Sequence, residues 1–417
     1  MNDLLTIARA AKAAARCMAT LSTTTKNAAL AAMATELLAR QNAILAANAL
    51  DLEAARADGM APAMLDRLAL SPQRLQAIVD GLHALIALPD PIGEIYEMQT
   101  RPNGLQVGKR RVPLGVVGVI YEARPNVTVD VAALCLKAGN AVILRGGSEA
   151  LRSNAALVDS MLAACRQSGV PDGAIGFVDS PDRAVVGQML RLNGYIDVVI
   201  PRGGAGLIKY VVENATLPVI ETGAGVCHTY VDRAADLEKA VRIVYNAKVR
   251  RPTICNALDT VLVHADVAAQ FLPLLAAEWA RAGVEMRCDP RALAILGPQR
   301  AIPARQDDWG KEFLALVAAV KVVDSLEEAL DHIYTYSSKH SEAIITEDYS
   351  AAMAFLDRVD AAAVYVNAST QFTDGGEFGL GAEIGISTQK LHARGPMGLR
   401  EMTTYKWIIL GGGQTRP

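Results

Sequence analysis

Cys255 is the residue whose neighbours in the sequence best suit covalent chemistry. It follows the basic pair Arg250-Arg251 and then Pro252. A cysteine is nucleophilic as the thiolate, and nearby cations lower the pKa of a thiol. Because the residue before a proline is restricted, we expect the chain to turn just ahead of Cys255. The segment therefore predicts a nucleophilic cysteine, with a buried and inert thiol as the alternative.

The other five cysteines are expected to be inert. They are widely spaced and form no CxxC pair: Cys17, Cys135, Cys165, Cys227 and Cys288. This pattern indicates neither a zinc site nor a disulfide framework, and it predicts reduced thiols in the cytoplasm. Cys227 is a secondary candidate because His228 adjoins it, although neighbours along a strand face opposite sides. We predict no metal site.

Two glycine-rich turns are candidates for binding a nucleotide. One is Arg145-Gly146-Gly147-Ser148, and the other contains Gly203 and Gly204. Each follows a predicted strand and precedes a predicted helix, where backbone N–H groups can bind phosphate. Neither turn matches GxGxxG, so plain turns remain the alternative. Arg145 would lie where it could bind a ribose 2′-phosphate, which favours NADP(H) over NAD(H).

The elements that would position these residues alternate along the chain. Helical spacing of apolar residues covers 4–21, 27–57 and 72–88, with Ser22-Thr23-Thr24 as a break and cap. Strands are expected at 115–120, 141–144, 175–178, 196–200 and 217–220, and in a second series at 229–231, 260–264 and 361–366. Helices are expected between them. Such alternation predicts two doubly wound α/β layers with parallel strands.

Composition excludes several classes of function. The chain has 417 residues, 51% hydrophobic and 20% charged, which suits two lobes with large cores. The formal net charge of −3 offers no global basic field for nucleic acid or anionic membrane. The longest apolar stretches fall short of the roughly 20 residues of a spanning helix. The N-terminus shows no signal sequence, so we expect a cytoplasmic protein.

An ordered set of motifs resembles the aldehyde dehydrogenase superfamily. Glu221 begins Glu-Thr-Gly-Ala-Gly, and Cys255 follows it by 34 residues, the register of that superfamily. Upstream, the run 113–120 and then Pro125-Asn126 are similar to its first strand and oxyanion asparagine. Further similar segments are 231–241, 136–143, 364–367 and 375–379. The resemblance implies an aldehyde dehydrogenase-like α/β fold with two parallel-sheet domains and a small oligomerisation arm.

The resemblance also implies roles for three residues. Cys255 would form a thioester, and the amide of Asn126 with the Cys255 backbone N–H would bind the oxyanion. For Asn126 the alternative is a helix N-cap. In hydrolytic relatives the residue matching Glu221 activates water. Here Glu221 would shuttle a proton or hold nearby backbone instead.

Three departures from the common pattern imply a particular reaction. The segments 121–130, 145–148 and 249–253 are similar to the branch of the superfamily that reduces an acyl phosphate. That branch converts L-glutamyl 5-phosphate to L-glutamate 5-semialdehyde and phosphate with NADPH, in proline biosynthesis. Candidates for holding the phosphate are loop residues, with solvated side chains as the alternative: Arg124, Arg250, Arg251 and Ser369.

A division into domains follows from the resemblance. Residues 1–96 and 115–223 would form the cofactor-binding domain and 224–385 the catalytic domain. Residues 97–114 and 403–417 would form the arm, and 386–402 a return segment. The apolar strand expected at 403–410 would add across a subunit boundary, so we expect a homo-oligomer of at least two subunits. Lys109-Arg110-Arg111 is then interpreted as solvated protection of a sheet edge.

Two other functions stay open. One is a hydrolytic NAD(P)-dependent semialdehyde dehydrogenase, which would need no phosphate to oxidise an aldehyde. The other is a catalytically silent nucleotide-binding or assembly subunit. Against it stands the set Asn126, Glu221 and Cys255, which such a subunit would not need. The resemblance also implies glutamate 5-kinase as the source of the unstable acyl phosphate, and leaves open whether the two proteins bind each other.

Overall fold

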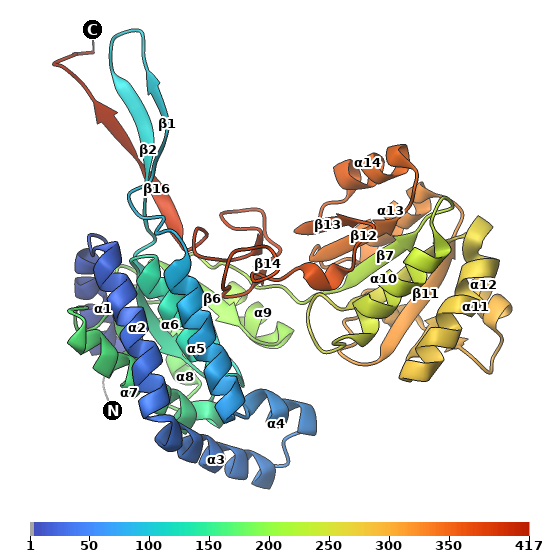
Figure 1. The fold of residues 1–417 in the computed structure, drawn as a ribbon, viewed down its shortest axis with the longest axis horizontal. Coiled ribbons are helices and arrows are strands. Elements are labelled where there is room, and N and C mark those ends of the chain that lie inside the picture. The colour runs from blue at the N-terminus through green and yellow to red at the C-terminus, as the bar shows by residue number, and fades with distance from the viewer. Residues whose placement is uncertain (1–3, 417) are drawn as a thin grey trace. The chain divides into compact units, whose positions relative to one another are not determined.

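The computed structural model describes residues 4–416, which form two compact units (Figure 1). The first unit contains the chain up to Thr222, then Gly379–Gly385 and the residues from Met397. The second contains Gly223–Phe378 and Ile386–Pro396. Residues 379–385 thus group with the first unit and not with the predicted catalytic domain 224–385. The predicted return segment 386–402 divides between the two units.

Hydrogen bonds and an ion pair explain this division. The backbone N–H of Met397 donates to the carbonyl of Gly385 at 2.8 Å, which joins the two late segments of the first unit. In the second unit, the guanidinium of Arg394 lies 2.7 Å from the Asp360 carboxylate. The return segment is therefore fixed to different units at its two ends.

The first unit is built on a parallel sheet with the strand order β5-β4-β3-β6. Its strands are β3 Val116–Tyr121, β4 Ala141–Arg145, β5 Ile175–Phe177 and β6 Val198–Arg202. All of β3 and β4 is buried, so these strands are apolar runs without alternation. Each strand ends at the same edge of the sheet, where the candidate turns follow.

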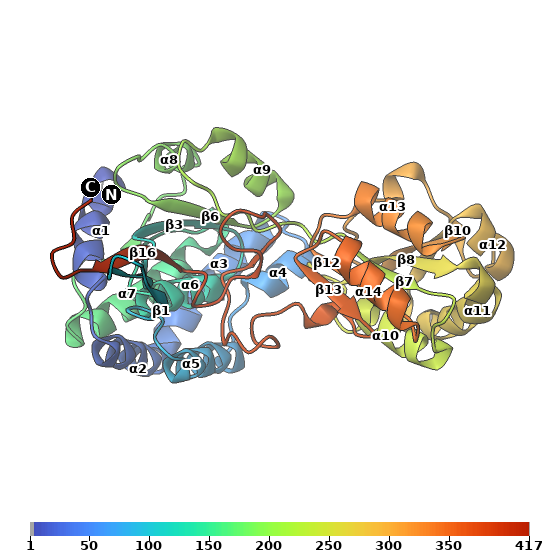
Figure 2. The same ribbon diagram turned by 90° about the horizontal axis from the view of Figure 1, so that it is seen from above.

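Helices cover both faces of this sheet (Figure 2). The helices of the unit are α1 Leu4–Met18, α2 Thr23–Ala39, α3 Gln41–Ala57, α4 Pro62–Leu68, α5 Pro72–Ala87, α6 Pro125–Lys137, η1 Ser148–Ala150, α7 Leu151–Gln167, α8 Ala184–Met189 and α9 Ala205–Asn214. Residues of α1, α8 and α9 form one core with β3 and β4. On the other side of the sheet, α6 contacts β4 and α7 contacts β5.

An antiparallel sheet of three strands extends from the first unit (Figure 1). Its strands are β1 Ile95–Thr100, β2 Gln106–Pro113 and β16 Thr403–Leu410. The last strand pairs with β2 of the same chain, from Thr403 opposite Pro113 to Leu410 opposite Gln106. This pairing completes the arm expected from 97–114 and 403–417, and β16 forms one edge of the sheet, so its pairing across a subunit boundary stays a prediction. We call these three strands the arm.

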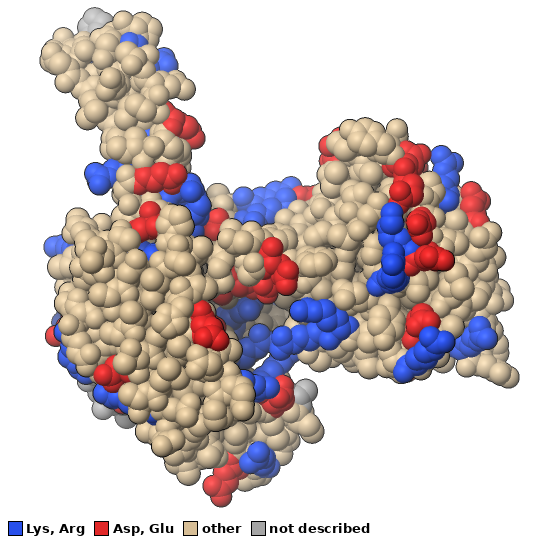
Figure 3. All heavy atoms as spheres, viewed as in Figure 1, with Lys and Arg blue, Asp and Glu red and all other residues tan. Residues whose placement is uncertain are grey.

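The basic residues of the arm are not edge protection. They lie on β2, the central strand, so their interpretation as a solvated edge is wrong. Lys109 is 2.6 Å from the Glu97 carboxylate, and its ammonium lies 4.7 Å from the ring centre of Tyr405. Arg111 is 3.2 Å from the carboxylate of Glu94. Cations and carboxylates therefore lie together on the arm, as Figure 3 shows.

The second unit has a parallel sheet in the order β10-β9-β11-β8-β7-β12-β13. Its strands are β7 Cys227–Val231, β8 Leu258–His264, β9 Glu285–Cys288, β10 Ile302–Pro303, β11 Val317–Val323, β12 Ser341–Ile345 and β13 Ala363–Val366. Its helices are α10 Leu237–Val249, α11 Ala265–Ala282, α12 Pro290–Leu296, η2 Gln306–Asp308, α13 Leu326–Tyr336, α14 Tyr349–Arg358 and η3 Thr370–Phe372. A short pair, β14 Ile386–Ser387 and β15 Gly395–Pro396, completes it.

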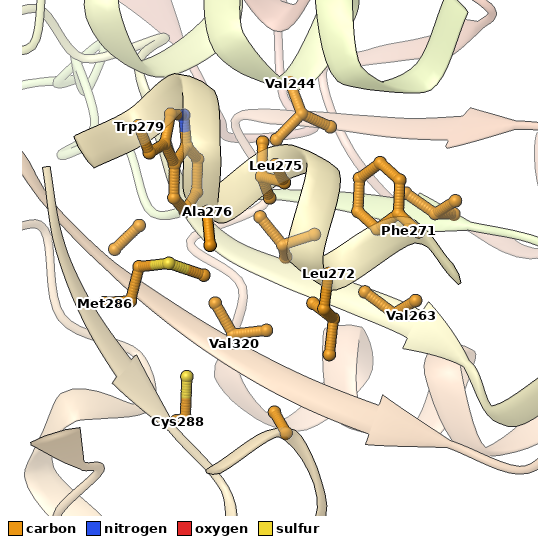
Figure 4. Packing of buried hydrophobic residues seen from close by; sticks show 14 of the residues in the cluster. Val244, Val263, Phe271, Leu272, Leu275, Ala276, Trp279, Met286, Cys288 and Val320 are labelled. Carbon is orange, nitrogen blue, oxygen red and sulfur yellow. The ribbon is translucent and has the colours of Figure 1, made fainter. Parts of the chain in front are cut away.

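The core of the second unit lies between α10, α11 and this sheet. Phe271 and Trp279 of α11 pack with Met286 of β9 and Val320 of β11 (Figure 4). All four are buried, and burying a large apolar side chain stabilises a fold by roughly 1.5–3 kcal/mol. This packing fixes β8 and α10, the two elements that flank Cys255.

The sequence-based elements differ from the structure in several places. The strand expected at 217–220 is reduced to one bridge between Val199 and Val219. The helix expected over 27–57 is two helices, divided at Arg40. Strands β9, β10, β11 and β12 of the second sheet are not among the expected strands, and β11 contains Lys321 within its apolar run. No helix within residues 4–416 has the length and hydropathy that crossing a membrane requires.

Candidate active site

Cys255 lies in the loop that joins α10 to β8 in the second unit, and it is partly exposed. The preceding helix ends at Val249, with Arg250 as its C-cap. Pro252 follows two residues later, and proline is common just beyond a helix end because it cannot continue the helix. We call residues 250–257 the nucleophile loop.

The segment before β7 holds the backbone of this loop. The Cys227 thiol donates to the carbonyl of Cys255 with Sγ and O at 3.3 Å. A Cβ on Gly225 would overlap that same carbonyl oxygen, so glycine is required for the close approach. The Gly225 N–H donates to the carboxylate of Glu312 at 3.1 Å. Gly225, the second glycine of the Glu-Thr-Gly-Ala-Gly run, is therefore needed for packing against the nucleophile loop.

A buried ion pair closes the base of the loop. Lys248, the residue before the end of α10, is 3.5 Å from the carboxylate of Asp259 at the start of β8. Burial lowers the pKa of Lys248, and burial raises the pKa of Asp259 to about 6. Asp259 also accepts from the backbone N–H of Phe313 at 3.1 Å. Removing one partner of such a buried pair is destabilising because it leaves an uncompensated charge.

The remaining cysteines have different surroundings. Cys135, Cys165, Cys227 and Cys288 are buried, and Cys17 is exposed on α1. Burial raises the pKa of Cys227 well above its ordinary value, and that of Cys165 and Cys288 to about 12. These thiols stay protonated near neutral pH and are poor nucleophiles.

Asn126 lies in the first turn of α6, in the first unit. The N-cap of that helix is Arg124, so the alternative role of Asn126 as an N-cap is wrong. Its side-chain amide donates to the Asp130 carboxylate, with Nδ2 and Oδ2 3.0 Å apart. Burial raises the pKa of Asp130 to about 6. The loop before α6 contains Ala123 at φ 45°, a conformation that non-glycine residues rarely adopt.

Glu221 also belongs to the first unit, next to its boundary at Thr222. Its side chain is half-buried. The adjacent Thr222 is buried and donates from its hydroxyl to the carbonyl of Pro201 at 2.6 Å. Of the three predicted catalytic residues, two therefore lie in the first unit and Cys255 in the second.

The turn after β4 is closed by side chains of the chain itself. A Cβ on Gly146 would overlap the Asn154 amide, and one on Gly147 would overlap the Glu149 carboxylate. The Glu149 carboxylate accepts from the Ala123 N–H at 2.7 Å. The glycines thus allow close packing here, and Ser148 is exposed at the start of η1.

Arg145, the last residue of β4, is 6% exposed. One of its terminal nitrogens lies 3.4 Å from the carbonyl of Asp182. Its Nε has no hydrogen-bond partner among residues 4–416. Burial lowers the pKa of its guanidinium. A buried cation with an unused donor fits an anionic group such as a ribose phosphate.

The second glycine-rich turn lies between β6 and α9. Gly204 is the N-cap of α9, and its N–H donates to the Glu122 carboxylate at 2.8 Å. A Cβ on Gly203 would be 2.5 Å from the same carboxylate. Negative charge is stabilised at a helix N-terminus. The turn therefore accommodates an anion, here a carboxylate of the chain.

The four candidates for holding phosphate lie in two groups. Arg250, Arg251 and Ser369 belong to the second unit with Cys255, and Arg124 belongs to the first. Both loop arginines are exposed. Ser369 is buried, and its hydroxyl accepts from the backbone N–H of Gln371 at 3.3 Å, so it caps η3.

Sequence reasoning missed residues that contact the nucleophile loop. Gln371 accepts from Arg250, with Oε1 and Nη1 3.3 Å apart. Asn256, directly after Cys255, donates to the carbonyl of Thr373 at 2.9 Å. The position of Asn256 beside Cys255 was a usable signal. Nothing in the sequence marks Gln371, because it is 116 residues away from Cys255.

Comparisons with known proteins agree on one family. The model of the aldehyde dehydrogenase family matches residues 2–306. Gamma-glutamyl phosphate reductase of Moorella thermoacetica is 59% identical over 414 residues, 99% of each chain. The protein of that name from Dehalococcoides mccartyi is 58% identical over 412 residues, 98% of this chain and 97% of the other.

Solved structures give the same result. The crystal structure of gamma-glutamyl phosphate reductase from Thermotoga maritima is 47% identical, with a TM-score of 0.97 over 100% of both chains. An acetylating aldehyde dehydrogenase from Geobacillus thermoglucosidasius shares the fold at 17% identity, with a TM-score of 0.71 over 100% of both chains. The chain therefore belongs to the aldehyde dehydrogenase family and, within it, to the gamma-glutamyl phosphate reductases.

Proposed function

We propose that this chain reduces L-glutamyl 5-phosphate to L-glutamate 5-semialdehyde and phosphate with NADPH, through a thioester on Cys255. The observation that carries the proposal is the nucleophile loop. It carries the partly exposed Cys255 in the same segment as Arg250 and Arg251, on a backbone that Gly225 and Cys227 hold. Two relatives named gamma-glutamyl phosphate reductase match the chain over nearly its full length.

The chemistry begins at the thiol. The Cys255 thiolate attacks the acyl carbon, a carbon–sulfur bond forms, and phosphate leaves with the electrons of the bond to the acyl carbon. Arg250 and Arg251 neutralise the charge of the leaving phosphate. The nicotinamide cofactor that family membership implies would, when bound, supply the hydride that reduces the thioester carbonyl. Collapse of the resulting hemithioacetal releases the aldehyde and returns the thiolate.

Both tetrahedral intermediates carry a negative oxygen. We assign its two donors to the Asn126 amide and the backbone N–H of Cys255. One N–H of the Asn126 amide is used by Asp130, and the other is available to an oxyanion. Losing one such donor costs about 3 kcal/mol of transition-state stabilisation. Glu221 is assigned to proton transfer or to holding backbone, since a water-activating base would hydrolyse the thioester.

Two groups of residues would hold NADPH. Arg145 provides a buried cation for the 2′-phosphate, and its unused Nε is the feature that supports this choice. The turn of Gly146, Gly147 and Ser148 and the turn of Gly203 and Gly204 provide backbone N–H groups. At the second turn the Glu122 carboxylate already binds the Gly204 N–H, so a phosphate there would replace it.

Phosphate dependence separates this function from hydrolysis. The assay is oxidation of L-glutamate 5-semialdehyde by NADP⁺, followed by absorbance of NADPH, with and without inorganic phosphate. We expect NADPH to form when phosphate is present, because phosphate must cleave the thioester. Equal rates without phosphate would instead show a hydrolytic dehydrogenase.

A further inference from the structure

The nucleophile loop is held by a second set of contacts. Gly225 and Cys227 precede the loop in the sequence, whereas this second set involves residues far beyond it. These contacts join Asn256 of the loop to three residues that follow β13, the edge strand of the sheet of the second unit. Four buried residues take part: Asn256, Thr370, Gln371 and Thr373. We call these four residues the clamp.

Asn256 both donates hydrogen bonds to the segment 370–373 and accepts one from it. Its side-chain amide donates to the carbonyls of Thr373 at 2.9 Å and Gln371 at 3.3 Å. Its own carbonyl accepts from the Thr370 hydroxyl at 2.7 Å. Since Asn256 directly follows Cys255, these bonds fix the backbone on which the thiol is carried.

Gln371 reaches the other end of the loop. Its Nε2 donates to the carbonyls of Ala247 at 2.8 Å and Arg251 at 3.4 Å. Its Oε1 accepts from Nη1 of Arg250 at 3.3 Å. Because Nε2 faces two carbonyl oxygens, Oε1 is the atom that faces the guanidinium. One side chain therefore orients Arg250 and holds the backbone of Arg251.

The clamp is itself attached to the sheet. The Thr373 hydroxyl is 2.7 Å from that of Ser341 on β12 and 2.8 Å from that of Tyr365 on β13. Hydroxyl groups that exchange hydrogen bonds in a buried site hold each other in one arrangement. The nucleophile loop is thus joined through the clamp to two strands of a packed core.

We propose that the clamp is a positioning device that sets the spacing between the Cys255 thiol and the Arg250 guanidinium. An acyl phosphate presents its acyl carbon and its phosphorus on either side of one bridging oxygen. The thiol must therefore meet the carbon while a cation meets the phosphate. A catalytic group displaced by about 1 Å can cost about a hundredfold in rate. The inference rests on the proposed function, and it assigns positioning roles to Asn256, Thr370 and Gln371.

Thr370 tests the half of the clamp that holds the thiol. Thr370→Val keeps the shape of the side chain and removes the donor to Asn256, whereas Thr370→Ser keeps the donor. We expect Thr370→Val to lower kcat by about ten- to a hundredfold and to change the pH profile of Cys255 alkylation by iodoacetamide. Thr370→Ser should keep kcat and the alkylation profile close to those of the parent chain. The KM for NADPH should be unchanged in both variants.

Thr335 offers a matched control. Its hydroxyl donates to the carbonyl of Asp331 at 2.8 Å on the surface of α13, so it is a threonine-to-carbonyl bond in the same unit that does not involve the nucleophile loop. Thr335→Val should leave kcat and the alkylation profile as they are in the parent chain. A loss of similar size in Thr335→Val would show a general effect of folding and would overturn the proposal.

Gln371 tests the half that orients Arg250. We expect Gln371→Met to raise the KM for inorganic phosphate in the oxidative direction by about tenfold. In an Arg250→Gln background, the same change should have no further effect on this KM, because the oriented group is already absent. Additive effects of the two substitutions would contradict the role of Gln371. If Thr370→Val does not fold, the double-mutant cycle of Gln371→Met and Arg250→Gln still tests the proposal.

The outcomes also separate this inference from the proposed function. Without phosphate-dependent oxidation by the parent chain, the proposed function fails. The alkylation of Cys255 needs no turnover and still reports on Asn256 and Thr370. Unchanged alkylation profiles in Thr370→Val, together with an unchanged phosphate KM in Gln371→Met, would overturn the clamp.

Discussion

Cys227 contacts the backbone of Cys255, and the two cysteines differ in exposure. The Cys227 thiol is fully buried and donates to the carbonyl of Cys255 at 3.3 Å. Burial raises its pKa well above the ordinary value, which keeps it protonated. Cys255 is partly exposed, in a loop that also contains Arg250 and Arg251. A reagent or substrate in solution should therefore react at Cys255.

We expect Cys255→Ser to abolish reduction and the covalent acyl-enzyme while leaving NADPH binding intact. Cys227→Ser is the matched control. It should keep most activity because its hydroxyl can donate to the same carbonyl. Mass spectrometry of the protein after incubation with substrate would locate the acyl group. Substrate trapped on Cys227 in the Cys255→Ser variant would transfer the role of nucleophile to Cys227.

Arg145 gives a second prediction at this scale. Arg145→Ala should weaken NADPH binding far more than NADH binding, because only NADPH has a 2′-phosphate to accept charge-assisted hydrogen bonds. The expected loss is about 1.5–3 kcal/mol. Titration of cofactor fluorescence measures both dissociation constants, with Arg145→Lys as the variant that keeps the charge. Equal losses for the two cofactors would show that Arg145 has a structural role only.

The sequence could predict the site as far as its local signals reach. Cys255 has basic neighbours and a proline, and Arg145 precedes a glycine-rich turn, so both were recognisable. Gln371 contacts the nucleophile loop only because the chain returns along β13. Asn126 was correctly placed at the start of a helix, but its bond to Asp130 depends on exact helical register.

At the scale of elements, α13 is attached to the second unit through a buried histidine. The His332 ring lies 5.3 Å from that of Trp309 and 4.7 Å from that of Tyr336, measured between ring centres. Burial is the main cause that lowers the pKa of His332 to about 3, with His228 and Lys321 contributing. The imidazole is therefore neutral in the folded protein at neutral pH.

This histidine makes stability depend on pH. The pKa of His332 in the folded protein lies below its unfolded value of about 6.5. Its contribution to the free energy of unfolding is therefore complete above about pH 6.5 and is lost as pH falls toward about 3. The loss is about 1.4 kcal/mol of unfolding free energy per pH unit in that range. His332→Phe should make the decrease shallower in urea unfolding followed by circular dichroism. His83→Phe, at an exposed histidine of α5, should leave the slope unchanged.

Equal slopes in the parent chain and in His332→Phe would show that His332 titrates normally. Comparing variant with parent matters, because Asp259 acts in the opposite direction. Its pKa is raised to about 6, so its contribution is present below about pH 4 and is lost as pH rises through about 6. The difference between the two curves cancels this effect.

Elements were predicted where their apolar pattern is uninterrupted, as in β3, β4 and α11. Strands β9, β10, β11 and β12 are absent from the sequence-based prediction, and in β11 Lys321 occurs inside the apolar run. The lysine is tolerated because its ammonium reaches Glu328 at 3.1 Å. A long side chain can cover apolar surface and still place its charge at a partner. Pattern reasoning on one strand cannot include such a partner.

At the scale of the whole molecule, the arm is the feature that invites assembly. Four apolar or aromatic side chains of β16 are each at least 46% exposed: Tyr405, Trp407, Ile409 and Leu410. Exposed apolar strands at a sheet edge favour pairing with another chain. We therefore expect a homo-oligomer, assembled through the arm.

Deleting residues 403–417 should give monomers or aggregates and lower activity, although no proposed catalytic residue is removed. The substitutions Ile409→Lys and Leu410→Lys keep the strand and should also shift the protein to smaller species. Sedimentation velocity measures both. A deletion variant that sediments like the full chain and stays fully active would rule out assembly through the arm.

The order of segments in the first unit also constrains how the chain is made. Its core begins with the first residues of the chain, yet the side-chain amide of Asn140 donates to the carbonyl of Met402 at 2.8 Å. Strand β2 likewise obtains its second neighbour in the sheet only when β16 has been synthesised. During translation, domains generally fold as units as they are synthesised. The second unit therefore has all its segments once Pro396 has been made, while the unit whose synthesis begins first is completed later, when β16 joins β2.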